Sequence, residues 1–413
     1  MRLSAVDLTS VAMEAPESPM HVGAILILAG RPAPQSLRPG PKLRRKLYRG
    51  CWVEDHAFRL ENHVTEVALE PPAGEAELLR LAERLIATPL ERSRPLWHLW
   101  VVTGLPRGRA ALIVLLHHAL ADGTAAIRLI GELLDPSMPP VPPPNRPLPS
   151  PSVPGAWRTL RQAWAAPRTS LNAPVRAGRR LGVTRMDLAE ARAVAHAAGG
   201  KANDVILAVI IGGLHDLLRA RGEPVAGVDL RVAVAVSLRK PGEESTGGNR
   251  NGSVVVRLAL SDASPAERLR AVVAETNRAK RGQAAAAQPR LMVLAARTGL
   301  ARRLARGQRL VNLVESDVTG PPAPVRACGV PVLDLIPLGA IAGNLMVAFV
   351  ALSYAGRLAV TVVADRDRFP DLPVLLAGME REWSALAPRT QPAHSFPTHS
   401  CSQVTGSGGF PWD

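Results

Sequence analysis

Two adjacent histidines, His117 and His118, are followed after three further residues by Asp122-Gly123, and this group has the clearest potential for chemistry in the chain. Imidazole exchanges a proton near neutral pH, which few other side chains do. A histidine between a strand and a helix stands where α/β folds place catalytic groups. A solvated pair of histidines in a turn is the alternative interpretation. The full HHxxxDG spacing after a strand favours catalysis, with His118, His117 and Asp122 as the candidates.

A general base without a protein nucleophile suits direct transfer of an acyl group from a thioester to a hydroxyl. His118 would accept the hydroxyl proton while the oxygen attacks the thioester carbonyl. A further donor must stabilise the oxyanion that develops, and the sequence does not identify it. Asp122 could orient the base or anchor the turn through an ion pair. Arg239, at the end of an expected strand, is a possible partner for that ion pair.

Several elements are needed to position this group. Residues 110–116 form an uninterrupted apolar run that predicts a buried strand, and residues 124–134 have helical spacing. Asp122-Gly123 marks the turn between them. Residues 97–103 predict a partner for the strand at 110–116, and Asn203 is a good cap for a helix at 204–221. Further strands are expected at 21–28, 230–237, 253–260, 347–354 and 357–364, and helices at 75–87 and 268–309.

A length of 413 residues favours two domains. We expect an N-terminal lobe at 1–135, a linker rich in proline and arginine at 136–170, a C-terminal lobe at 171–388 and a disordered tail at 389–413. The three cysteines are widely spaced, which argues against a disulfide framework or zinc site and for a reducing cytosol. No metal site is expected. His394, His399 and Cys401 lie in the tail, which holds no fixed geometry.

The formal net charge of +15 comes almost entirely from arginine and is clustered. A surface of this kind attracts anionic lipid head groups, the phosphates of coenzyme A or nucleic acid. Nucleic acid is disfavoured because no recognition motif accompanies the charge. Acidic residues near the N-terminus argue against a signal peptide, and the uncharged stretch 335–356 is interpreted as a loop and buried strands rather than a membrane span. The chain also lacks a GxSxG elbow, a P-loop and a GxGxxG fingerprint.

An ordered set of short motifs accompanies the histidines, and together they resemble the bacterial wax ester synthase/acyl-CoA:diacylglycerol acyltransferase family over roughly residues 1–388. HHxxxDG alone is shared with nonribosomal condensation domains and chloramphenicol acetyltransferases, whereas the ordered set is more specific. The motifs are Leu3-Ser4-Ala5-Val6-Asp7, Pro19-Met20-His21-Val22-Gly23, Trp52-Val53-Glu54-Asp55, Asn62-His63-Val64, Arg92-Ser93-Arg94-Pro95-Leu96-Trp97, Asn203-Asp204, Ser237-Leu238-Arg239, Gly248-Asn249 and Leu352-Ser353-Tyr354-Ala355-Gly356.

The resemblance implies an α/β (α+β) fold of two sandwich lobes like chloramphenicol acetyltransferase, with the active site in a tunnel at their interface. It implies an enzyme that esterifies diacylglycerol, and also long-chain alcohols, with acyl-CoA as the acyl donor. Acyl-CoA would be a substrate, and no cofactor is expected. His118 would be the base, and Asp122 would be mainly structural and turned away from the substrate. The motifs around Gly123, Pro95-Leu96-Trp97 and Asn203-Asp204 would support the site. A buried anchor and a helix cap are the structural alternatives for the last two motifs.

One segment departs from the family pattern. Where Ser-Asn-Val-Pro-Gly-Pro is usual, Asp317 replaces Asn and Thr319 replaces Pro. If that loop lines the tunnel, the added carboxylate would repel the phosphates of CoA or weaken binding of an apolar acceptor. Two other functions therefore stay open. One is a condensation-like acyltransferase that uses a carrier-protein thioester, and the other is a lipid-surface binding protein that has lost turnover. We expect a cytoplasmic protein held peripherally on an anionic membrane or lipid inclusions.

Overall fold

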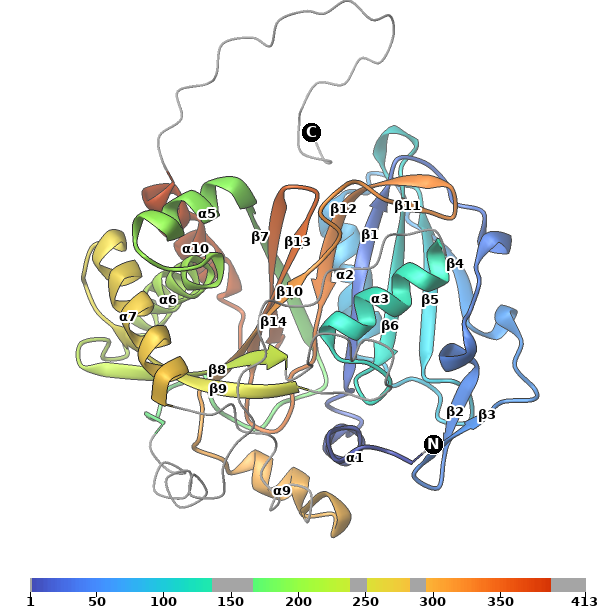
Figure 1. Ribbon diagram of the computed structural model, residues 1–413, viewed down its shortest axis with the longest axis horizontal. Helices are drawn as coiled ribbons and strands as arrows, with labels where there is room; N and C mark the ends of the chain where they lie inside the picture. Colours follow the sequence, from blue (N-terminus) through green and yellow to red (C-terminus); the bar gives the residue numbers. More distant parts are fainter. Residues whose placement is uncertain (1, 136–165, 238–250, 283–294, 388–413) are drawn as a thin grey trace, which may run out of the picture.

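The computed structural model describes residues 2–135, 166–237, 251–282 and 295–387. Most of the expected linker, the tail at 389–413 and the site candidate Arg239 lie outside the described residues, as does Gly248-Asn249. The described chain forms two lobes, each built on a six-stranded sheet with helices against it (Figure 1).

The first sheet carries His117 at the end of a central strand, and His118 follows in the turn. Its order is β11-β12-β1-β6-β5-β4, and β1 pairs antiparallel with both β12 and β6. Both faces of β1 are buried, which explains why this strand is apolar throughout. The strands are β1 His21–Leu28, β4 Val64–Ala68, β5 Trp97–Thr103, β6 Ala110–His117, β11 Arg326–Ala327 and β12 Val330–Leu338.

Other elements of the N-terminal lobe flank this sheet. Helix α2 (Glu75–Ile86) contacts the second lobe through β7, and α3 (Gly123–Leu134) follows the histidines and packs near β1. A small hairpin is made by β2 (Arg45–Tyr48) and β3 (Cys51–Glu54), outside the main sheet.

The second sheet has the order β7-β14-β13-β10-β8-β9, and β10 runs parallel to both of its neighbours. Helices α5, α6, α7 and α10 lie on its outer side (Figure 1). The strands are β7 Arg179–Asp187, β8 Val228–Ser237, β9 Asn251–Leu260, β10 Leu313–Thr319, β13 Val347–Tyr354 and β14 Arg357–Asp365, and the helices are α5 Leu188–Ala197, α6 Ala202–Ala220, α7 Pro265–Gly282 and α10 Leu372–Leu386.

The expected division of the chain at 1–135 and 171–388 needs one amendment. Strands β11 and β12 belong to the second half of the sequence but complete the first sheet, where Ile336 pairs with Ile25. The chain then returns to the second sheet at β13, so the two lobes are joined by shared strands as well as by contact. Periodicity could not reveal this because a buried apolar strand fits either sheet equally well.

Two predicted helices differ from the structure. Helix α6 begins at Ala202 rather than Asp204, so Asn203 lies in its first turn and is not the cap. The capping role falls to Asp204, whose carboxylate accepts a hydrogen bond of 2.7 Å from the backbone N–H of Lys201. The helix expected at 268–309 is not continuous, because α7 ends at Gly282 and a separate short helix, α9 (Ala301–Arg306), follows Gly299, whose φ is +74°.

The uncharged stretch 335–356 contains the end of β12, a loop and β13, as predicted. Within the described residues no single helix has the length and apolarity to cross a bilayer. Helices α5 and α6 meet that criterion only when taken together, across a bend of 93°.

Candidate active site

Strand β6 delivers the two histidines to the edge of the first lobe. His117 is its last residue and is buried, whereas His118 is partly exposed. The backbone N–H of His118 donates a 2.7 Å hydrogen bond to the carbonyl of Met20, which ties the turn to the segment before β1. The N–H of Ala119 donates to Nδ1 of His117 at 2.9 Å. Of the two histidine side chains, that of His118 is therefore the more accessible to solvent.

Asp122 fixes the start of α3. Its side chain accepts a 2.9 Å hydrogen bond from the N–H of Ala125, which is the bond of a helix N-cap. The following Gly123 is required by a close approach between the lobes, since a Cβ atom there would lie 2.8 Å from Cγ2 of Val318. The Asp-Gly pair thus sets the turn after His118 and lets β10 of the second lobe pack against it.

A carboxylate contacts the buried histidine. Oε1 of Glu14, directly after helix α1 (Ala5–Met13), lies 3.4 Å from Nε2 of His117, and its Oε2 lies 2.5 Å from Arg92. Burial raises the pKa of Glu14, but hydrogen bonding and the charges of His117 and Arg92 outweigh it and lower the pKa to about 2. Because Nδ1 of His117 accepts a hydrogen bond, the bond pattern assigns its proton to Nε2, facing Glu14.

Burial governs the protonation of the neighbouring histidines. His21 pairs directly with His117 across β1 and β6, and burial lowers the pKa of His21 to about 4, helped by the charge of His117. Burial also lowers the pKa of His118, against the opposing charges of Asp122 and Asp7. Both side chains are therefore neutral at physiological pH, and a neutral imidazole is the form that can accept a proton.

Trp97 of the PLW motif anchors the first lobe. It is 1% exposed, and its indole N–H donates a 2.7 Å hydrogen bond to the carbonyl of Leu43. The ring of His63 stacks on it at 4.6 Å between centroids. Leu96 is buried beside it, and Pro95 bridges to Lys46. The contact between this motif and the histidine site is made by Arg92, which pairs with Glu14. Trp97, five residues later, packs in the core of the lobe.

The Asn203-Asp204 motif lies at the start of α6 in the second lobe. Besides capping the helix, Asp204 accepts a 2.7 Å hydrogen bond from the hydroxyl of Thr276 on α7. Asn203 lies close to Glu315 of β10, which is fully buried. Burial and the charge of Asp317 raise the pKa of Glu315 well above its ordinary value, and the Asn203 amide opposes this only weakly. The carboxyl group of Glu315 is thus held towards its uncharged form.

The segment that departs from the family pattern is a strand, not a loop, because residues 313–319 form β10. Alternation along the strand puts Ser316 and Val318 towards Gly123, and Glu315 and Asp317 on the other face. Loss of hydration within the surrounding protein raises the pKa of Asp317 to about 6. The altered residues therefore lie on a strand that touches the Asp-Gly turn.

Three charged residues of this region were not among the predicted site residues: Glu14, Arg92 and Glu315. Glu14 stands close to a predicted motif and Arg92 begins one, but no spacing rule connects either residue with His117, which is distant in sequence. Glu315 lies in the segment interpreted from the sequence as a loop, so no sequence signal marks it as a buried carboxylate.

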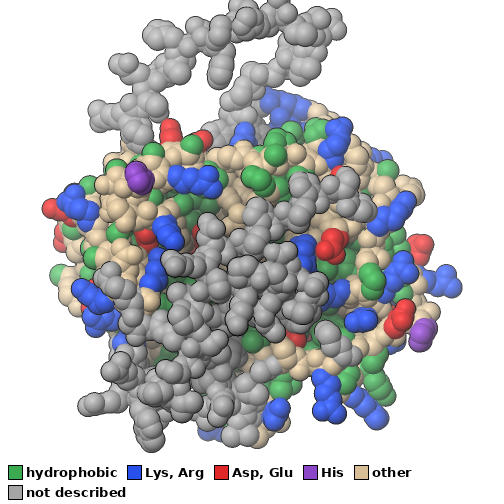
Figure 2. Space-filling model, in the orientation of Figure 1, with side chains coloured by type: hydrophobic (Ala, Val, Ile, Leu, Met, Phe, Trp, Pro, Cys, Tyr) green, Lys and Arg blue, Asp and Glu red, His purple; other side chains and the backbone are tan. Residues whose placement is uncertain are grey.

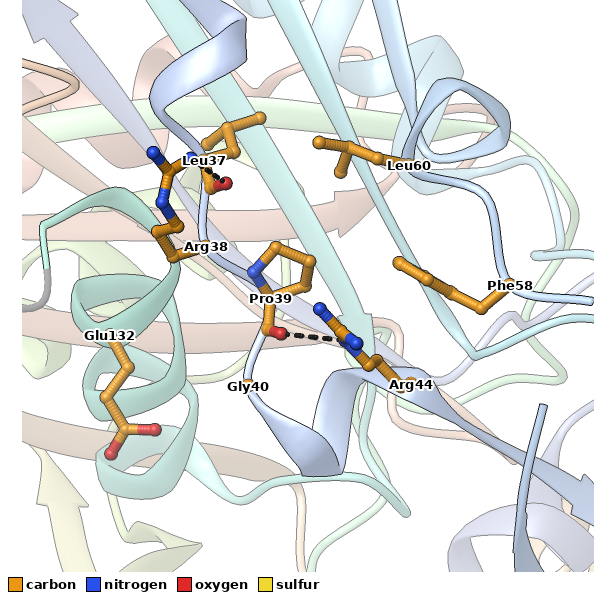
Figure 3. A pocket seen from close by; sticks show the side chains of 8 residues that line it. All are labelled: Leu37, Arg38, Pro39, Gly40, Arg44, Phe58, Leu60 and Glu132. Atoms are coloured by element: carbon orange, nitrogen blue, oxygen red, sulfur yellow. Dashed lines mark hydrogen bonds between the residues drawn. The ribbon is translucent and has the colours of Figure 1, made fainter. Parts of the chain in front are cut away.

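A cavity of about 530 Å³ lies elsewhere on the first lobe (Figure 3). Phe58 and Leu60 face Leu37 across it, and none of its lining residues is a predicted site residue. In the described ranges, no group of three or more His, Cys, Asp or Glu side chains is arranged to hold a metal ion.

Comparison with known proteins places the chain in a family. Residues 3–159 and 152–206 match the wax ester synthase/diacylglycerol acyltransferase catalytic domain, and residues 247–387 match the C-terminal domain of the same family. A protein named probable diacylglycerol O-acyltransferase from Mycobacterium tuberculosis is 32% identical over 418 residues, which cover 87% of this chain and 90% of the relative.

Two solved structures share the fold. The wax ester synthase/diacylglycerol acyltransferase from Marinobacter aquaeolei VT8 superposes with a TM-score of 0.71 at 24% identity, covering 94% of this chain and 98% of that one. A starter condensation domain of rhizomide synthetase, in complex with C8-CoA and Leu-SNAC, gives a TM-score of 0.59 at 16% identity, with 96% of each chain covered. The chain therefore belongs to the wax ester synthase/diacylglycerol acyltransferase family of acyltransferases.

Proposed function

We propose that the protein transfers a fatty acyl group from acyl-CoA to the free hydroxyl of diacylglycerol, which makes triacylglycerol, and that it also esterifies long-chain alcohols to wax esters. The observation that carries this proposal is the placement of His118. It is a partly exposed, neutral histidine at the end of β6, in a chain whose relatives are named diacylglycerol O-acyltransferases. The C8-CoA bound by the rhizomide synthetase domain supports a CoA thioester as donor.

In the proposed reaction His118 takes the proton of the acceptor hydroxyl as its oxygen attacks the thioester carbonyl. The tetrahedral intermediate then collapses, the C–S bond breaks, and the sulfur of CoA leaves with the proton held by the imidazolium. His117 would hold the turn through Ala119 and Glu14, and Asp122 would fix α3 without touching substrate. No metal or further cofactor takes part in this scheme.

We place the protein in the cytoplasm, held peripherally on an anionic membrane or lipid inclusions. The support is the net charge of +15 together with the apolar character of the proposed acceptor. Nucleic acid is not a proposed partner.

The test uses purified protein, labelled palmitoyl-CoA and either diacylglycerol or a long-chain alcohol, with the lipids resolved by chromatography. We expect ester product from the parent and a loss of at least about a hundredfold in His118→Ala. His196→Ala, on the exposed side of α5, is the matched control and should keep the parental rate.

A correctly folded His118→Ala variant with parental turnover would overturn the proposal. Product only from a carrier-protein thioester would favour the condensation-like alternative, and vesicle binding without product would favour a non-catalytic lipid-binding protein.

A further inference from the structure

Three large hydrophobic side chains stand out as exposed among the described residues. They are Tyr48, 55% exposed, Leu300, 52% exposed, and Leu304, 46% exposed. Tyr48 adjoins the turn of the β2–β3 hairpin, and the two leucines lie one helical turn apart at α9. The hairpin turn and α9 are both at the lower edge of the molecule, with α1 between them (Figure 1). The exposed apolar groups thus gather at one edge instead of being scattered.

Helix α1 connects the hairpin and α9 into one surface. At its start, the N–H of Leu3 donates a 3.1 Å hydrogen bond to the carbonyl of Gly50 in the hairpin turn. On its other side, Leu8 packs with Ala301 of α9 in a small apolar cluster. We call this surface the α1 edge, and define it by the exposed residues Arg2, Tyr48, Arg49, Arg297, Leu300, Arg302, Arg303, Leu304 and Arg306.

The charge of the α1 edge is strongly positive. Six of its nine residues are exposed arginines, and the guanidinium of Arg49 also lies 5.3 Å from the centroid of the Tyr48 ring. Nearby carboxylates offset little of this charge. Glu17 pairs with Arg306, while Glu14 is turned inward to His117 and Arg92. Basic side chains stand beside hydrophobic ones at the lower right in the space-filling view (Figure 2).

We propose that the α1 edge docks onto an anionic lipid surface. Leucine and tyrosine would enter the head-group boundary, and the arginines would extend to the phosphates. Buried apolar area and electrostatic attraction both strengthen binding to such a surface. A nucleic acid would be bound by the arginines but would gain nothing from the exposed leucines. This inference rests on the proposed function, in which the acceptor is a lipid. Helix α1 ends at the residue before Glu14, so a lipid bound at this edge would lie next to the His117–His118 turn.

The test measures co-sedimentation of the full chain with phosphatidylcholine vesicles, with or without phosphatidylglycerol. Arg297→Gln with Arg303→Gln should weaken binding to the anionic vesicles about 25-fold, at about fivefold per arginine. Tyr48→Ser with Leu300→Ser and Leu304→Ser should weaken it at least about tenfold. The matched control is Arg192→Gln on α5 with Arg357→Gln at the start of β14, two exposed arginines outside the α1 edge, and should bind like the parent.

Acyl transfer from palmitoyl-CoA to a dispersed short-chain alcohol is measured on the same variants and should be unchanged, since none of these residues belongs to the proposed site. The docking proposal is overturned if both sets of variants sediment like the parent, or if duplex DNA binds the parent more tightly than anionic vesicles do. If the vesicle results hold but the parent makes no ester, the proposed function fails while the docking surface stands.

Discussion

Oε1 of Glu14 lies 3.4 Å from Nε2 of His117, so the residue after helix α1 contacts the last residue of β6 across the lobe. Nδ1 of the same imidazole accepts a 2.9 Å hydrogen bond from the N–H of Ala119. His117 is therefore held on both of its nitrogens. Since His118 is the next residue, we expect the position of the proposed base to depend on the Glu14 carboxylate.

Replacing Glu14 by Gln should lower kcat by roughly tenfold to a hundredfold, with little change in KM for acyl-CoA, because the base would be misplaced while the donor site stays intact. The pKa of Glu14 is about 2, so the carboxylate is charged throughout the neutral range and the loss should be the same at acid and neutral pH. Glu61→Gln, at an exposed position of the same lobe, is the control. A parental kcat in Glu14→Gln would show that His117 needs no such support.

The pH dependence of kcat/KM should report the lowered pKa of His118. The base must be neutral, so activity falls as the pH drops through the pKa of the free enzyme, and burial puts that pKa below the ordinary 6.5. Asp7 contributes an opposing charge, so Asp7→Asn should move the acid limb to still lower pH. A limb centred at or above 6.5 would argue against His118 as the titrating base.

Local sequence patterns located most of the elements around the site. The strands at 21–28, 97–103 and 347–354 have the bounds that alternation and apolar runs predict, because each pattern is contained within its own strand. The prediction that Asn203 caps α6 was wrong for a local reason. Asp204 at the third helical position binds the N–H of Lys201, and this competes with the preference of Asn203 for the cap.

Long-range pairings could not be predicted. Strand β12 pairs with β1 from the opposite half of the chain, and Glu14 meets His117 only because α1 and β6 end at the same place. Neither relationship leaves a periodic signal. The fold class came instead from the resemblance of the ordered motifs to a known family, and the proposed base came from the HHxxxDG spacing together with that resemblance.

A second contact between the lobes should control stability. Arg185 of β7 donates to Glu75 of α2 at 2.9 Å and to Asp334 of β12 at 2.9 Å. The Asp334 side chain is only 2% exposed, so removing its partner leaves a buried charge uncompensated. Arg185→Ala should lower the free energy of unfolding by about 3 kcal/mol in urea titrations. Arg357→Ala, at an exposed position on β14, should change it by less than about 0.5 kcal/mol. Equal effects of the two substitutions would contradict a role for the Arg185 contacts in joining the lobes.

Asp317→Asn tests whether the departure on β10 weakens substrate binding. Loss of hydration raises the pKa of Asp317 to about 6, so the side chain is charged above that pH and neutral below it. The opposite face of this strand touches Gly123 of the histidine turn, so the Asp317 charge would act on a bound acyl-CoA or acceptor through the field around β10 and not by contact at the turn. Above pH 6 the variant should have a KM for acyl-CoA or acceptor that is lower by roughly fivefold, since a like charge at this range costs about 1 kcal/mol. Below that pH the parental carboxyl is protonated and resembles the amide, so the difference should disappear.

Glu54→Gln, exposed on β3, controls for the loss of one negative charge and should leave KM unchanged. A KM ratio between parent and Asp317→Asn that stays constant across pH would show that ionisation of this residue does not reach the substrates.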